Sequence, residues 1–355
     1  MPICVNRVEM GFVMFKNKKV VALFLIGIFT FGLITGLVSG CSFLDPYISQ
    51  SSEYPAEQPI DGEVKDISED LLIVPLTRSP AVSTVLVPTA SGTKVAKNDK
   101  AIIDYSNITD GYVMVKWLTK TTEQLRVQVA GPGSETYTYY IWPNDTYEVF
   151  PLSDGNGKYT VGVFEHVGGG RYARANNVDF RVTLKNEFAP FLHPNQYVNF
   201  TKDSKAVAKA AELVTGVSDL LDKTAAVYKF VIGNITYDTK LANDIVAGKH
   251  PGYLPDIDAV LASRKGICFD YAALMTAMLR SQNIPTKLVV GYADKVKHAW
   301  ISVYSEKTGW INNVIFFDGK DWKMMDPTFA AAATSSKSLQ AFIGDGNSYT
   351  MTHLY

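Results

Sequence analysis

The spacing of apolar residues changes near Thr201, and this change most constrains how the 355-residue chain can fold. Between about residues 101 and 184, apolar and polar side chains alternate, which is typical of strands that bury one face. Beyond Thr201 the apolar residues recur at helical spacing, which predicts one helix over residues 204–222 and a second over residues 224–232. The pattern therefore predicts an α+β protein, with an all-β domain ahead of a mixed domain.

The alternating region predicts an all-β sandwich, assigned to residues 99–186. Turn-forming groups of glycine, proline, asparagine and aspartate separate the expected strands. Short strands at such spacing favour an immunoglobulin-like arrangement. The expected strands cover residues 111–118, 125–130, 137–142, 157–165 and 178–184. Because the region contains no cysteine, it lacks a disulfide between sheets.

The N-terminal segment has the features of a targeting signal rather than of a folded domain. Lysines at positions 16, 18 and 19 precede an uncharged run from Val20 to Gly40, which predicts a signal peptide over residues 1–40. The run ends in Ser39-Gly40-Cys41, which resembles the lipobox of secreted bacterial lipoproteins. That resemblance implies lipidation of Cys41 and a cell-membrane location on the extracytoplasmic face. The alternative is a plain transmembrane anchor, which the length of the run also permits.

Residues 41–98 show no periodicity and are rich in serine, proline and acidic side chains, so we expect a flexible tether. The net charge of −1 gives no electrostatic reason to expect nucleic acid as a partner. No paired cysteine motif suggests a metal, and no glycine-rich loop suggests a nucleotide, so no cofactor is expected.

Cys268 begins the most informative segment of the mixed domain, assigned to residues 187–355. The sequence predicts a helix over residues 269–282, with Tyr271, Leu274 and Met278 on one face. Cys268 would then lie at the helix N-terminus, where the macrodipole and unpaired N–H groups stabilise a thiolate. Gly266 would allow close approach of the backbone just before the thiol.

Two further residues complete a pattern for nucleophilic catalysis. Strands are expected over residues 286–293 and 299–304 and through 321–325, with His298 at the start of the second and Asp326 after the third. In this chemistry a cysteine attacks a carbonyl, a histidine moves the proton, and a carboxylate orients the imidazole. Cys268, His298 and Asp326 are therefore the predicted triad.

Four blocks of sequence support this prediction through a resemblance. Gly266-Ile267-Cys268-Phe269-Asp270-Tyr271-Ala272, Gly291-Tyr292, His298-Ala299-Trp300 and the run from Trp322 to Thr328 resemble the transglutaminase-like superfamily, which has a papain-like fold. The resemblance covers about residues 201–333. It implies that Cys268 is the nucleophile, His298 the general base and acid, and Asp326 the orienting group. Trp300 and Asp270 are expected to be structural, packing or hydrogen-bonding near the site.

The oxyanion hole is less clearly marked. The backbone N–H of Cys268 is one expected donor, and relatives take a second donor from a side chain upstream of the cysteine. Tyr237 is the candidate for that second donor, against the alternative of an ordinary strand tyrosine.

Three functions fit these residues. The first is a hydrolase of amide bonds, either a peptidase or a deamidase, and the second is a transferase that passes the same acyl group to an amine. Both would act through a thioester on protein or peptide substrates, including cell-wall peptide. The third is a non-catalytic binding protein at the cell surface.

Overall fold

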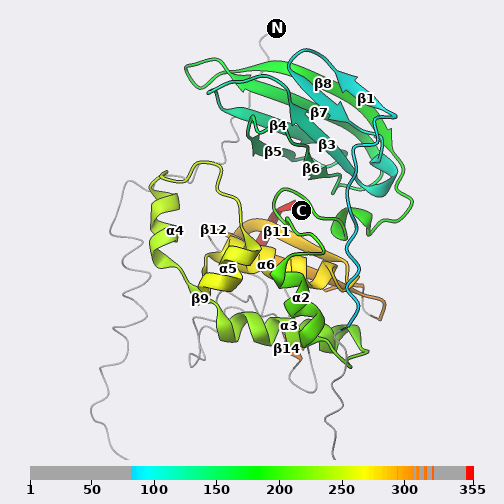
Figure 1. Cartoon of the computed structure of the whole chain (residues 1–355), viewed down its shortest axis with the longest axis vertical. Coiled ribbons are helices and arrows are strands. Elements are labelled where there is room, and N and C mark those ends of the chain that lie inside the picture. The colour runs from blue at the N-terminus through cyan, green and yellow to red at the C-terminus, as the bar shows by residue number, and fades with distance from the viewer. Residues whose placement is uncertain (1–80, 294, 308, 312–315, 318–321, 324–348) are drawn as a thin grey trace, which may run out of the picture. The chain divides into compact units, whose positions relative to one another are not determined.

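A computed structural model describes residues 81–293, 295–307, 309–311, 316–317, 322–323 and 349–355. The predicted signal peptide, Cys41 and Asp326 lie outside the described residues. All described residues belong to one compact unit (Figure 1). Among them, every helix is too short or too polar to cross a bilayer.

The first part of the described chain consists of two four-stranded antiparallel sheets. Along β4 the side chains alternate between buried and partly exposed, which is the period of two that the sequence showed. One sheet has the order β1 (Val95–Lys97), β2 (Ala101–Asp104), β3 (Tyr112–Trp117) and β6 (Glu148–Pro151); the other has the order β5 (Thr136–Ile141), β4 (Leu125–Ala130), β7 (Gly157–His166) and β8 (Tyr172–Val182). The immunoglobulin-like identity of this part stays a prediction.

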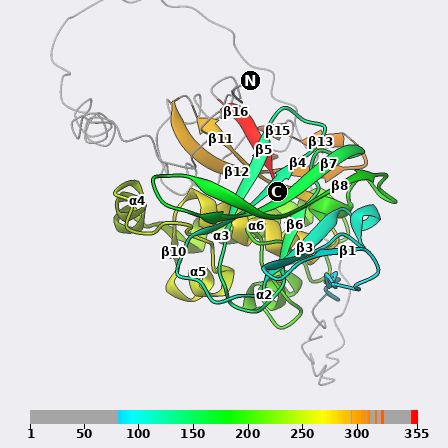
Figure 2. The same ribbon diagram turned by 90° about the horizontal axis from the view of Figure 1, so that it is seen from above.

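The second part mixes helices and strands, as predicted. The helices are α2 (Lys205–Leu213), α3 (Leu220–Asn234), α4 (Thr239–Val246), α5 (Ile257–Ser263) and α6 (Cys268–Arg280). The strands are β9 (Thr236–Tyr237), β10 (Lys265–Gly266), β11 (Thr286–Ala293), β12 (Val296–Ser305), β13 (Gly309–Ile311), β14 (Phe316–Phe317), β15 (Trp322–Lys323) and β16 (Tyr349–Leu354). The four-stranded sheet of this part has the order β13-β12-β11-β16, and α6 lies among α2, α3 and α5 (Figures 1 and 2).

Two expected boundaries were wrong. The helical spacing over residues 204–222 suggested one helix, but α2 stops at Leu213 and α3 begins at Leu220. Gly216 has a φ of +75°, which breaks the helix, and the Asp219 carboxylate accepts the N–H of Leu221 at 2.8 Å as a new N-cap. The tether was expected to reach residue 98, yet β1 is paired with β2 and the N–H of Thr84 donates to Ser281 O at 2.7 Å. Backbone pairing therefore orders the end of that segment.

One buried apolar core runs through both parts of the described chain. It contains Val127 of β4 as well as Leu274 of α6. Tyrosines connect the two regions, because the ring of Tyr197 lies 5.2 Å from that of Tyr139 and 4.6 Å from that of Tyr355. Burial of these large rings is favourable by a few kcal/mol each, so the two parts stabilise each other.

Gly291, in the centre of the sheet, leads to a testable prediction. A Cβ at this position would lie 2.0 Å from Thr350 O and 2.7 Å from Cη2 of Trp300. Gly291→Ala is therefore expected to lower the free energy of unfolding by about 2–3 kcal/mol, measured by urea denaturation. The control is Gly233→Ala in α3, where a Cβ meets no atom within 4 Å and stability should rise by up to about 1 kcal/mol. Equal midpoints for both variants would contradict the clash.

Candidate functional site

Cys268 is the first residue of α6, so the predicted position of the thiol at a helix N-terminus is confirmed. The predicted apolar face is also confirmed, because Tyr271, Leu274 and Met278 are fully buried. Cys268 itself is partly buried and free of any disulfide. The core therefore holds α6 firmly while its first residue stays accessible.

A buried carboxylate fixes the start of this helix. Asp270 Oδ2 accepts the N–H of Ile267 at 2.8 Å, and its Oδ1 accepts the hydroxyl of Tyr253 at 2.8 Å. Burial raises the pKa of Asp270, and these two hydrogen bonds oppose that rise. A Cβ on Gly266 would lie 2.7 Å from Cβ of Asp270, so the close approach needs glycine here. The cap thus holds the residues on either side of Cys268 in one geometry.

The connection after α6 brings β12 to the same end of the site. Arg280, the last residue of α6, donates from Nε to Thr286 O at 2.9 Å, which anchors the C-terminal end of the helix to the start of β11. β11 and β12 are antiparallel, with Thr286 opposite Val303 and Gly291 opposite His298. The helix and the strand segment from Val303 back to residue 297 are each about 20 Å long. The N-terminal end of α6 and the beginning of β12 therefore lie toward the same end of the sheet.

His298 lies at that end of the sheet as the third residue of β12, two residues inside the strand rather than at its start. Its side chain is 6% exposed and stacks on Trp300, with ring centroids 6.2 Å apart and planes tilted by 22°. Tyr349 of β16 lies 6.2 Å from the same imidazole. Aromatic packing therefore limits the orientations of this histidine. Asp326 is outside the described residues, so its place in the triad stays a prediction.

Tyr237 lies beside the segment that leads into Cys268. β9 and β10 form a parallel pair in which Tyr237 is opposite Gly266, and the N–H of Asp238 donates to Gly266 O at 2.9 Å. The side chain of Tyr237 is 41% exposed. Its backbone is thus two residues from the nucleophile across a ladder, while the oxyanion role of its hydroxyl stays a prediction.

Two residues of this region were not found from the sequence. Lys297 precedes His298, and its pKa is lowered by burial, an effect that the charge of Cys268 opposes. In the sequence, only its position next to His298 could have pointed to Lys297 as a residue of the site. Tyr253 comes from the loop between α4 and α5, and nothing in its local sequence points to Asp270. Only the folded chain reveals that contact.

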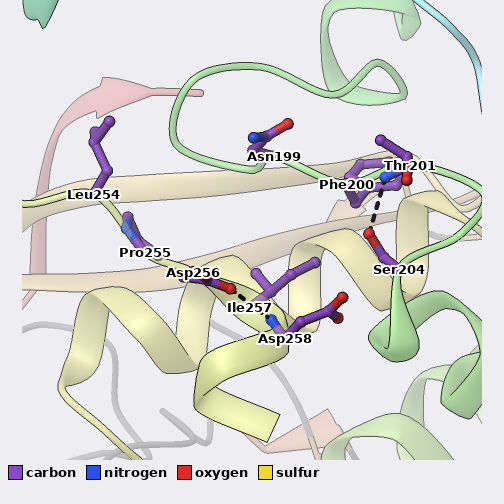
Figure 3. A pocket seen from close by; sticks show the side chains of 9 residues that line it. All are labelled: Asn199, Phe200, Thr201, Ser204, Leu254, Pro255, Asp256, Ile257 and Asp258. Carbon is purple, nitrogen blue, oxygen red and sulfur yellow. Dashed lines mark hydrogen bonds between the residues drawn. The ribbon is translucent and has the colours of Figure 1, made fainter. Parts of the chain in front are cut away.

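A hollow of about 320 Å³ lies elsewhere, between residues 199–204 and the start of α5 (Figure 3). Its polar groups are used within the fold. Asp256 Oδ1 accepts the N–H groups of Asp258 and Ala259, and the Asp258 carboxylate accepts those of Lys205 and Ala206. These carboxylates cap α5 and α2. The hollow therefore has a structural explanation and contains none of the predicted catalytic residues.

Comparison with known proteins supports the class that these residues define. The family model of the transglutaminase-like superfamily matches residues 207–313. This segment of the chain is therefore transglutaminase-like, which confirms the resemblance seen in the motifs. The match includes Cys268 and His298 and ends before Asp326. No curated protein matches the chain.

Solved structures with similarity to this chain include proteins named as transglutaminases and as cysteine proteases. A cysteine protease candidate from Cytophaga hutchinsonii is 15% identical over 74% of each chain, with a TM-score of 0.34. A structure named only as a TGase is 20% identical over 47% of this chain and 43% of its own, with a TM-score of 0.27. The red sea bream transglutaminase is 12% identical over 66% of this chain and 53% of its own, with a TM-score of 0.24. These TM-scores are low, so the family match carries the assignment.

Proposed function

We propose that this chain is a cysteine-dependent acyl-transfer enzyme that hydrolyses or transamidates amides of proteins or peptides. The observation that supports this most is Cys268 as the first residue of a buried helix, whose N-terminal end lies toward the end of the sheet where β12 begins. Acyl transfer through a thioester requires a nucleophile and a base, and Cys268 and His298 are the residues proposed for these two roles. The superfamily match over this segment favours the same chemistry.

The proposed reaction has two steps. The Cys268 sulfur attacks the amide carbonyl, His298 delivers a proton to the leaving nitrogen, and an amine or ammonia departs. Water or a second amine then attacks the thioester, His298 accepts its proton, and the thiolate is released. The Cys268 backbone N–H and Tyr237 are the proposed donors to the oxyanion, and Asp326 is the proposed partner of the imidazole.

The place of action is part of the same proposal. Cys41, behind the uncharged run and two small residues, would carry the lipid that anchors the protein to the outer face of the cell membrane. Cell-wall peptide and surface proteins would then be the accessible substrates. Incorporation of radiolabelled fatty acid into wild type but not into Cys41→Ser would test the anchor.

Labelling of the thiol tests the nucleophile. An alkylating probe is expected to label Cys268 near neutral pH, and Cys268→Ala should remove that label and reduce turnover by about a thousandfold or more. Peptide mapping locates the label, and Cys41→Ser serves as the control that keeps it. Unchanged labelling of the mapped region in Cys268→Ala would contradict a reactive thiolate here.

A second assay separates the three possible functions. Incubation with a glutamine-containing peptide and a labelled primary amine reports transamidation, while ammonia release or peptide cleavage reports hydrolysis. We expect hydrolysis to exceed amine incorporation. If a labelled Cys268 is found but neither product forms on any peptide of a library, the binding-protein alternative gains over the enzyme.

A further inference from the structure

Lys297 is a charged residue on the face of β12 that meets α6. Side chains alternate along a strand, and Ala299 and Ile301 pack in the same core as the apolar face of α6. Lys297 is two residues before Ala299 and so lies on the same face of β12, the face that packs against α6. It is at the end of the sheet where the helix begins. Its cross-strand neighbour Tyr292 is exposed, so this end is open to solvent.

The ammonium group of Lys297 has no acidic partner in the part of the chain that the structure describes. No hydrogen bond or ion pair joins it to another described residue, although its side chain is half-buried. The charge that opposes its desolvation is that of Cys268. His353 of β16 is a titratable neighbour, and its pKa is lowered first by burial and also by Lys297. Lys297 is thus a partly desolvated cation beside the nucleophile.

An approaching anion stabilises such a cation. The half-buried ammonium has lost part of its hydration, and no acidic neighbour among the described residues compensates for that loss. A carboxylate on a substrate that has docked at Cys268 would supply that anion. The Cys268 sulfur is the competing partner, but it carries no charge once the thioester forms, and the ammonium would then be unpaired during the second step.

We propose that Lys297 forms an anion-binding subsite that selects acyl donors with a carboxylate next to the reacting amide. The subsite rests on the proposed function for its biological meaning, because it names the class of substrate that Cys268 would attack. Its physical content is independent of turnover: a negative group brought to the Cys268 sulfur is attracted by Lys297.

A pair of alkylating probes tests this independently of any enzyme activity. Iodoacetate and iodoacetamide both lose iodide to the same thiolate, and they differ in the charge carried next to the reacting carbon. The ratio of their rate constants at Cys268, followed by peptide mapping, therefore measures the local charge rather than the fraction of thiolate. Lys297→Met is expected to lower the iodoacetate-to-iodoacetamide ratio about fivefold, as one nearby unit charge in a partly hydrated site predicts.

Two variants make this test specific. Lys297→Arg retains the positive charge and should retain the ratio, while Lys295→Met removes an exposed lysine two residues away and should leave it unchanged. Thermal unfolding of each variant checks that it is folded. An unchanged ratio in Lys297→Met would overturn the subsite. If both rate constants fell by the same factor, the ratio would be unchanged, and Lys297 would act on the thiolate alone.

Matched peptides extend the test to substrates. Donors that differ only by aspartate or asparagine beside the reacting residue should be turned over at different rates by wild type, and Lys297→Glu should reverse the preference. If wild type turns over neither peptide, the proposed function fails while the alkylation ratio still decides the subsite. If wild type turns over both equally, the subsite fails while the proposed function stands.

Discussion

Replacing Arg280 with methionine is expected to lower the free energy of unfolding by about 3 kcal/mol or more. Arg280 is 1% exposed, and its guanidinium donates to His193 O at 2.7 Å, to Tyr355 O at 2.6 Å and twice to Thr286 O. These carbonyls belong to the connection between the two parts, to the residue after β16, and to β11. Methionine fills a similar volume but leaves the three carbonyls without these donors.

Urea denaturation measures this effect, with Arg181→Met as the control. Arg181 is exposed on β8, so its replacement should change stability by no more than about 0.5 kcal/mol. Arg280→Lys should be intermediate or worse, since one ammonium cannot span carbonyls on three segments as a planar guanidinium does. A loss below about 1 kcal/mol in Arg280→Met would show that water replaces the guanidinium at this junction.

Replacing Asp270 with alanine is expected to cost about 2–3 kcal/mol and also to slow alkylation of Cys268. The change removes the acceptor of both the Ile267 N–H and the Tyr253 hydroxyl. Because these bonds flank Cys268, the first turn of α6 would lose its fixed geometry. The loop that carries Tyr253 also touches the first part of the chain, since a Cβ on Gly252 would lie 3.1 Å from Trp142 and 3.3 Å from Tyr140.

A pair of tyrosine variants distinguishes positioning from stability. Tyr253→Phe removes one hydrogen bond to Asp270. Tyr271 lies on α6, the helix of Cys268, and Tyr271→Phe removes its hydrogen bond of 2.6 Å to Ile235 O. Each should cost about 1 kcal/mol, but only Tyr253→Phe should slow the reaction of Cys268 with iodoacetamide in the folded protein. Equal alkylation rates in the two variants would mean that the Tyr253 contact contributes stability alone.

Local pattern was sufficient for the elements that depend on neighbours in the sequence. The strand predicted over residues 286–293 has the same bounds as β11. The apolar face of the helix that begins at Cys268 is buried, as its spacing predicted. The single helix expected over residues 204–222 was wrong because apolar spacing alone does not register a glycine with positive φ or a new N-cap. Cys268 and His298 both lie within regular elements, α6 and β12, which local pattern also predicted.

Long-range contacts could not be predicted in the same way. Tyr253 and Asp270 are 17 residues apart, and Arg280 and Tyr355 are 75 residues apart. Which hydroxyl meets which carboxylate depends on how the loop between α4 and α5 packs against the start of α6, and no local periodicity encodes that. Lys297 illustrates the same limit, because its importance comes from the face it shares with α6 and from the lack of a carboxylate partner among the described residues.

For this protein, the sequence by itself determined the change from strands to helices, the helix that begins at Cys268, and the transglutaminase-like motifs, because hydrophobic period and residue type act over a few neighbouring positions. The tertiary structure decided how that helix is held and what lies near its cysteine: the buried cap of Asp270 and the cation of Lys297 at one end of α6, and the anchoring by Arg280 at the other. Their positions follow from packing of segments far apart in the chain, where burial and hydrogen bonding select one arrangement among many that the local pattern allows.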